Sequence, residues 1–384
     1  MFTYGDFGYG VQDGIVWIAY YHCSAQNAAI PDSIEGMPVV GIGYRAFYGC
    51  ASLTNVIIPN SVTHIDREAF RDCVNLTDVT MTTNVTEIPD LAFMGCTSLT
   101  RLTIPKGLRG IANGAFWGCT SLTSVTIPDG VTYISTAAFV HCTGLTNVTI
   151  PASTTEIADQ AFMDCTALTS LTIPNGAWRI AQQMFWGCTG LTNLDIPKTV
   201  TRIEHGAFAY CMGLTNITIP DSVTRIGAAF YGCTNLISMT IPSNVRLIGA
   251  NTFGGCTSLE SVYFRGNAPR VQSTLFNGAD AVRVYYLAGT AGWGPTFAGR
   301  PTAFWVLSSP VILAFGDGFG VRTNRFGFVI SWATNDVPVA VEACSDLTQP
   351  SWAAASVAMK QGSCYFTDAG WTNHPARFYR VRLP

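Results

Sequence analysis

The sequence contains few charged residues, and the two signs nearly balance. Asp, Glu, Lys and Arg make up 12% of the 384 residues, with 21 basic against 24 acidic side chains and a net charge of −3. Domains that bind nucleic acid or anionic lipid need a clustered basic surface, which this composition does not supply. We therefore expect no nucleic-acid partner.

Segments for targeting and membrane spanning are also lacking. No run approaches the roughly 20 apolar residues that cross a bilayer, so direct insertion into a membrane is not expected. The first ten residues, MFTYGDFGYG, carry neither the basic nor the apolar region of a signal peptide. Two interpretations stay open: an intracellular protein, or a chain that begins after a removed leader.

Motifs of catalysis and metal binding are missing as well. The five histidines are scattered, and the sequence has no nucleophile elbow, metalloprotease motif, phosphate loop or C-x-x-C pair. We predict that the protein is not an enzyme and that it has no cofactor and no metal site.

What the sequence does contain is a repeat marked by cysteine. Ten of the thirteen cysteines recur every 23 residues, with a single gap of 22. A fixed period of this length indicates a solenoid, in which stacked units bury a shared core. The ten residues are Cys50, Cys73, Cys96, Cys119, Cys142, Cys165, Cys188, Cys211, Cys233 and Cys256.

The regular spacing also predicts the state of these cysteines. Equivalent positions of a solenoid lie about one strand spacing apart, roughly 5 Å. Their side chains point in the same direction, whereas the two partners of a disulfide must point at each other. We predict that all ten are buried free thiols that pack as small apolar side chains.

Residues 119–141 illustrate the repeat. Val125 and Ile127 alternate with a threonine, which predicts a strand with one buried face. A second short extended piece is expected at 131–134, and Ala138 with Phe139 forms a compact turn that fills the core. The short period loses one residue between Ile226 and Phe230, in the turn, so the core should survive there.

The repeats resemble a known family. Near-copies of L-x-x-V-x-I-P followed by A-F-x-x-C are similar to the bacterial surface leucine-rich repeats of the BspA-like or treponemal type. The resemblance implies a slightly curved solenoid of 23-residue leucine-rich repeats, mostly β with short turns or single helical turns. It also implies a location outside the cell or at its surface, and a role in adhesion or in binding protein or matrix.

Three parts are expected along the chain. Residues 1–46 form an N-terminal cap, and 47–306 form the solenoid with a C-terminal cap. In this cap 281–286 is the last strand, and the aromatics of 288–301 plug the end. Residues 307–384 show short alternating segments typical of a small antiparallel β-sandwich.

The C-terminal segment also resembles an immunoglobulin- or fibronectin-III-like domain, on residues 342–352 and 371–380. Cys344 and Cys364 lie there in two expected strands, 20 residues apart. They either form a disulfide or are two unrelated buried thiols.

Columns of equivalent side chains are the candidate ligand-binding residues. One column lies between the Val and Ile of the strand, and a second threonine row follows the Leu. Both have a plain structural explanation in β propensity and hydroxyl ladders. An arginine column and a set of aromatics after the turn Phe could likewise be a solvated face and turn packing. The candidates are Thr103, Thr126, Thr149 and Thr172; Arg179, Arg202 and Arg225; and Trp117 and Trp186, with Tyr48 and Tyr231 in the same aromatic set.

The function predicted from these features is non-catalytic adhesion or binding. We expect a monomer that presents an extended repeat surface to a protein or glycan ligand, along the threonine-lined strand face and the arginine edge. The alternative is an intracellular scaffold for protein interaction. A remote alternative is ice binding by the threonine rows.

Overall fold

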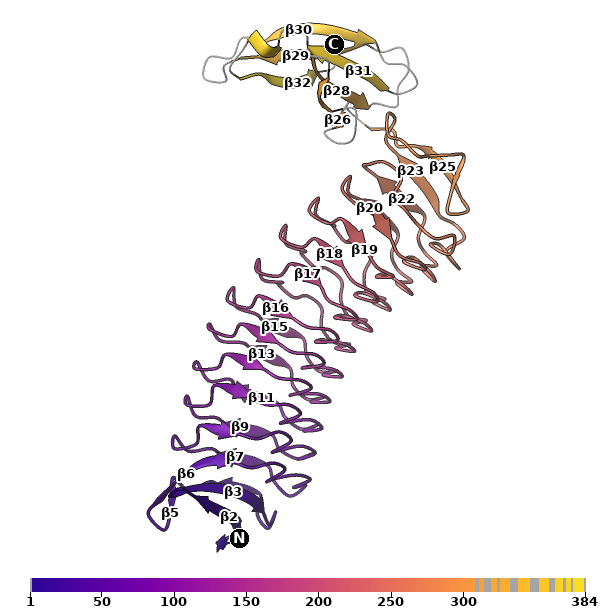
Figure 1. Cartoon of the computed structure of the whole chain (residues 1–384). Coiled ribbons are helices and arrows are strands. Elements are labelled where there is room, and N and C mark those ends of the chain that lie inside the picture. The colour runs from indigo at the N-terminus through magenta and orange to yellow at the C-terminus, as the bar shows by residue number, and fades with distance from the viewer. Residues whose placement is uncertain are drawn as a thin grey trace.

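The computed structural model describes residues 2–307 and, in the C-terminal part, residues 311–313, 319–322, 325–331, 338–345, 352–358, 363–368, 371–373 and 376–382. Figure 1 shows the repeats stacked into an elongated, bent rod with the N-terminal cap at one end. The smaller C-terminal unit follows the other end. The side chain of Cys364 lies outside the described part, so the choice between a disulfide with Cys344 and two unrelated thiols stays open.

The first strands of neighbouring repeats stack on one another, and together they form the first-strand row. Pairing is parallel and in register by one period, as for Val125 opposite Val148. Between β15 and β20 the row continues through a single bridge from Thr172 to Asp195. Its strands are β4 (Asn27–Ala29), β7 (Asn55–Ile57), β9 (Asp78–Thr80), β11 (Arg101–Thr103), β13 (Ser124–Thr126), β15 (Asn147–Thr149), β20 (Ser238–Ile241), β22 (Ser261–Phe264) and β23 (Arg283–Tyr286).

A second short strand follows a turn that contains a proline in most repeats, and these strands form the second-strand row. They also pair in parallel, as for Ile203 opposite Ile226. The row consists of β8 (His64–Ile65), β10 (Glu87–Ile88), β12 (Gly110–Ile111), β14 (Tyr133–Ile134), β16 (Glu156–Ile157), β17 (Arg179–Ile180), β18 (Arg202–Ile203), β19 (Arg225–Ile226) and β21 (Leu247–Ile248).

The core between the two rows contains a continuous stack of phenylalanine rings. Successive ring centroids are 4.8–5.9 Å apart along the whole stack. Each ring enters from the turn that follows the second strand, and all are buried. The predicted solenoid with a shared core is therefore confirmed. The rings belong to Phe47, Phe70, Phe93, Phe116, Phe139, Phe162, Phe185, Phe208, Phe230, Phe253 and Phe276.

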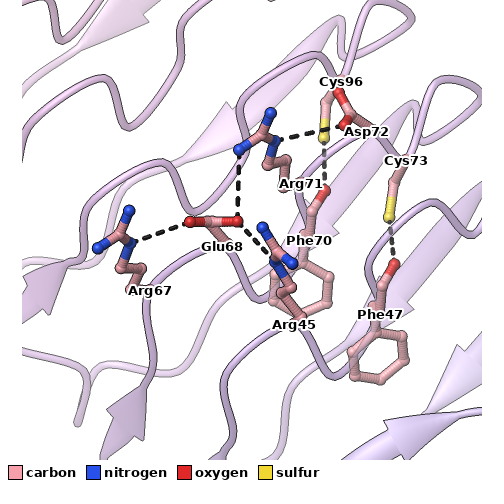
Figure 2. Close-up of polar contacts among 9 residues, drawn as sticks. All are labelled: Arg45, Phe47, Arg67, Glu68, Phe70, Arg71, Asp72, Cys73 and Cys96. Atoms are coloured by element: carbon pink, nitrogen blue, oxygen red, sulfur yellow. Dashed lines mark hydrogen bonds and ion pairs between the residues drawn. The ribbon is translucent and has the colours of Figure 1, made fainter.

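Nine of the ten cysteines in register form the predicted ladder of buried thiols. Each thiol donates a hydrogen bond to the carbonyl oxygen of the Phe in the preceding repeat, as Cys73 does to Phe47 at 3.0 Å and Cys96 to Phe70 at 3.1 Å (Figure 2). Burial raises the pKa of Cys142 from its ordinary value of 9.0 to about 12. The Cys142 thiol is therefore a structural group that stays protonated at neutral pH.

The prediction of a free thiol is wrong for Cys50. It is bonded to Cys23, whose Cα atom lies 5.1 Å from that of Cys50. Cys23 precedes the first repeat and does not occupy an equivalent position, so the argument from parallel side chains does not apply to this pair. The bond ties the cap to the first repeat.

Caps close both ends of the solenoid. At the N-terminus, β1 (Phe2–Tyr4), β2 (Phe7–Gln12) and β3 (Ile15–Tyr21) pair with one another in antiparallel order. β3 also pairs in parallel with β6 (Met37–Ile42). β6 in turn pairs with β5 (Ser33–Ile34) and with β8 of the second-strand row. At the other end β23 is not the last strand, contrary to the prediction. β25 (Arg300–Phe304) pairs with it in parallel and with β24 (Thr296–Phe297) in a hairpin. The rings of Trp293 and Phe297 pack on Phe264 and close the core, as expected.

The C-terminal unit contains two antiparallel sheets. β28 (Arg325–Ser331) pairs with β26 (Val311–Leu313), β27 (Gly320–Arg322) and β31 (Ser363–Asp368), while β29 (Pro338–Cys344) lies between β30 (Ala353–Ala358) and β32 (Phe378–Arg382). A short 3-10 helix, η2 (Trp371–Asn373), precedes the last strand. Side chains of both sheets, including Phe328 and Val341, share one small core. The predicted antiparallel sandwich is confirmed.

The short repeat keeps the core in register. The rings of Phe208 and Phe230 stack at 5.4 Å across the missing residue, which confirms that the core survives. Turns of most repeats begin with a residue in the left-handed region, such as Gly206 (φ 67°) and Asn251 (φ 53°), but no residue between Ile226 and Phe230 has a positive φ. The deletion therefore removes the residue that starts the turn.

Candidate functional site

The threonine column lies on the first-strand row. Thr103, Thr126 and Thr149 are the last residues of β11, β13 and β15 and are exposed, and Thr172 is exposed at the bridge to Asp195. Within residues 2–307, no protein group forms a hydrogen bond with these four hydroxyls. The first three line a shallow groove of about 680 Å³ together with Lys106. The column thus offers unpaired hydroxyls along several repeats.

The second threonine row has a structural role. Most of its hydroxyls donate to a backbone carbonyl of the preceding turn, as from Thr77 to Thr54 at 3.0 Å and from Thr146 to Thr123 at 3.0 Å. Five members are bonded in this way, namely Thr54, Thr77, Thr100, Thr146 and Thr192. The ladder explanation therefore accounts for most of this row.

The arginine column lies on the second-strand row and not beside the threonine column. Arg179, Arg202 and Arg225 are the first residues of β17, β18 and β19 and pair side by side. Arg179 forms an ion pair with Asp159 at 3.3 Å. Arg225 is exposed and, within the described solenoid, has no acidic partner. The threonine-lined strand face and the arginine edge thus lie on two different rows of strands.

Trp178 stands directly before β17, at a position where most neighbouring repeats have a threonine. Its indole is 48% exposed. The guanidinium carbons of Arg179 and Arg202 lie 5.3 and 5.9 Å from its ring centroid. The sequence showed the unusual residue, but its contact with two members of the arginine column depends on the stacking of two repeats.

The predicted aromatic set divides in the structure. Trp117 is half-buried in the turn layer, with the His141 ring 6.4 Å away. Trp186 instead belongs to a row in which its ring contacts Tyr210 at 4.9 Å and Tyr210 contacts Tyr231 at 5.4 Å. Sequence reasoning missed Tyr210, because neighbouring repeats carry Gly187 and Gly232 at its position.

Trp186 and Arg225, predicted separately, line one groove. This groove has a volume of about 410 Å³ and lies over the turn of the short repeat. Glu204, His205 and Tyr231 also line it. We call it the short-repeat groove.

A buried carboxylate with three arginines lies near the N-terminal cap (Figure 2). The side chain of Glu68 is 2% exposed and accepts hydrogen bonds from Arg45 at 2.7 Å, Arg67 at 3.0 Å and Arg71 at 3.3 Å. Burial by itself raises the pKa of this carboxyl. The hydrogen bonds from Arg45 and Arg67 lower the pKa by more than burial raises it, so the pKa lies below its ordinary value. The three guanidinium groups are held by Glu68, which makes the cluster a structural tie between turns.

Among the described residues, no cluster of three or more His, Cys, Asp or Glu side chains could hold a metal ion. In the same part of the chain, no helix has the length and apolar character needed to cross a bilayer.

The stacked parallel strands, the buried Phe and Cys columns and the exposed polar columns define a leucine-rich repeat solenoid. The family described as BspA type leucine-rich repeat region matches residues 15–146, 109–228 and 155–283, which together cover more than half of the sequence. The chain therefore belongs to this family. No curated protein matches it in sequence.

Solved structures agree with this assignment. A leucine-rich repeat protein from Bacteroides ovatus is 26% identical, with a TM-score of 0.64, over 74% of this chain and 84% of that one. A leucine rich cell surface protein from Faecalibacterium prausnitzii is 28% identical, with a TM-score of 0.52, over 75% of this chain and 95% of that one. Both likenesses concern the solenoid fold.

Proposed function

We propose that the chain is a non-catalytic adhesion or binding protein of the bacterial cell exterior. Its first-strand row presents the threonine column to a glycan or protein ligand. The observation that carries the proposal is the difference between the two threonine rows. Within residues 2–307, the hydroxyls of Thr103, Thr126 and Thr149 are exposed and unpaired, whereas most of those of the second row are hydrogen-bonded to the backbone. Solenoids bind along such extended faces, so the affinity should be spread over several repeats.

Two observations support the exterior location. The solved relative from Faecalibacterium prausnitzii is described as a cell surface protein. The Cys23–Cys50 bond is also of the kind that persists in oxidising compartments. The intracellular scaffold, our second candidate, would keep this pair reduced. The C-terminal sandwich, which we propose to be immunoglobulin- or fibronectin-III-like, would serve as a spacer or anchor.

Ice binding by the threonine rows has less support. It would use both rows as regular arrays of available hydroxyls, and most hydroxyls of the second row are already bonded to carbonyl oxygens. One row remains for that role.

The proposal is tested by binding of the full chain to an array of glycans and matrix proteins. For each ligand found, the double variant Thr126→Lys and Thr149→Lys should bind at least about tenfold more weakly, the equivalent of about 1.4 kcal/mol. The matched control is Thr132→Lys with Thr155→Lys, which places the same charges in the same repeats beside the second-strand row. Equal loss in both double variants, or no ligand on the array for the native chain, would refute the assignment to the threonine column.

A further inference from the structure

The short-repeat groove exists because one residue is missing. In a regular pair of turns, the N–H of the left-handed residue donates to a carbonyl of the next turn, as Gln183 does to His205 at 2.9 Å. The short repeat has no such residue between Ile226 and Phe230. Within residues 2–307, no N–H therefore donates to the equivalent carbonyl of the following turn, that of Ala250. The turn is shortened, and a hollow remains beside it.

Neighbouring residues have adapted to the shortened turn. Thr252 stands where most repeats have Ala, and its buried hydroxyl lies 2.8 Å from the carbonyl oxygens of both Gly227 and Gly249. A Cβ atom on Gly227 would lie 2.7 Å from the backbone nitrogen of His205, and one on Gly249 would lie 2.9 Å from the carbonyl carbon of Gly227. Only glycine fits where these turns approach so closely. The floor of the groove is therefore made of close-packed backbone and alanine.

The side chains around the groove differ in chemistry from the rest of the rod. Arg225 extends from the second-strand row without an acidic partner in the described solenoid, and Trp186 and Tyr231 supply aromatic rings. The Oδ1 atom of Asn251, a lining residue, is buried and has no hydrogen-bond partner. Glu204 adds one negative charge, which disfavours a ligand with many negative charges.

We infer that the short-repeat groove binds a single sugar unit that carries a carboxylate, as part of a glycan. The guanidinium group of Arg225 matches the planar carboxylate, with which it can form two parallel hydrogen bonds. The aromatic faces are electron-rich and pack against the C–H groups of a pyranose ring. The volume of about 410 Å³ falls within the range of small-molecule sites, roughly 300–1,000 Å³. This site lies apart from the threonine column, and the inference does not depend on the function proposed for that column.

The test uses methyl β-glucuronide as the probe and methyl β-glucoside as the matched sugar without a carboxylate. Titration of the full chain, followed by calorimetry or ligand-detected NMR, should give binding of the glucuronide that is at least about tenfold tighter than that of the glucoside. Arg225→Met should remove this preference. Arg202→Met, which alters the adjacent member of the same column outside the groove, should leave it unchanged.

A second variant tests the origin of the groove. Insertion of one glycine after Gly227 restores the 23-residue period and should abolish glucuronide binding while the repeat fold is retained, as judged by circular dichroism. The inference is overturned if the native chain does not distinguish the two sugars or if Arg202→Met has the same effect as Arg225→Met. It is also overturned if the insertion variant binds as well as the native chain. Binding of glucose 6-sulfate as tightly as methyl β-glucuronide would likewise exclude a carboxylate-bearing sugar as the ligand. So would binding of acidic peptides by a chain that does not bind the glucuronide.

Discussion

Replacing Phe139 by alanine removes one ring from the middle of the phenylalanine stack. The side chain has no exposed surface, and its ring lies 5.3 Å from that of Phe116 and 5.5 Å from that of Phe162. Loss of a buried Phe costs about 3–5 kcal/mol through lost burial and the cavity that remains. Each repeat contacts only its neighbours, so the loss is concentrated at two adjacent interfaces. We expect Phe139→Ala to lower the stability by this amount and to divide unfolding into two transitions.

Urea unfolding followed by circular dichroism and tryptophan fluorescence measures this effect. Phe276→Ala, at the last ring of the stack, removes one ring contact of 5.6 Å to Phe253 and should affect only the C-terminal end. Thr126→Ala, on the exposed face, should change the stability by no more than about 0.5 kcal/mol. The reasoning is refuted if Phe139→Ala unfolds in one transition at the native midpoint.

Three further predictions concern titratable and bonded groups. Burial raises the pKa of the Cys142 thiol to about 12, so in the unfolded chain this thiol ionises at a lower pH than in the folded one. Its contribution to stability is therefore fully present below pH 9.0 and is lost as the pH rises toward 12. An unfolding midpoint that stayed constant to pH 11 would contradict this. Glu68→Gln should lower Tm at pH 7, because it leaves three arginines without their carboxylate. It should also remove the part of the acid destabilisation that sets in as the pH falls below 4.5. Denatured, unreduced protein should show eleven reactive thiols, because two of the thirteen cysteines are bonded as Cys23–Cys50. The number should be nine if Cys344 and Cys364 are bonded too. Thirteen reactive thiols would contradict the bond in the cap.

The regular part of the fold could be predicted from the sequence, because period and alternation determine it. The spacing of Phe139 and Cys142 predicted the stacked core, and Val125 with Ile127 predicted the first strand. The terminal strand β25 was missed because the repeat has decayed before Arg300. The Cys50 bond was missed because its partner, Cys23, lies outside the column to which the periodic argument applies.

The candidate sites were less predictable for a related reason. The sequence identified Arg225 and Trp186 as unusual positions, but it assigned them to different sets. Their common groove depends on how a shortened turn packs against the turns before and after it. Tyr210, in turn, occupies a position whose pattern suggests glycine, so no periodic signal marks it as aromatic.

The Cys23–Cys50 bond makes the two ends of the rod mechanically unequal. The N-terminal end is clamped covalently, whereas the C-terminal end is held by the packing of Trp293 and Phe297. A pulling force transmitted through the C-terminal sandwich reaches the uncrosslinked end first and peels repeats away one at a time. Each detached repeat of 23 residues lengthens the chain by roughly 70 Å, compared with the 5.3 Å between neighbouring rings in the intact stack. A load on the C-terminal end would therefore be taken up one repeat at a time, toward the end that the Cys23–Cys50 bond holds.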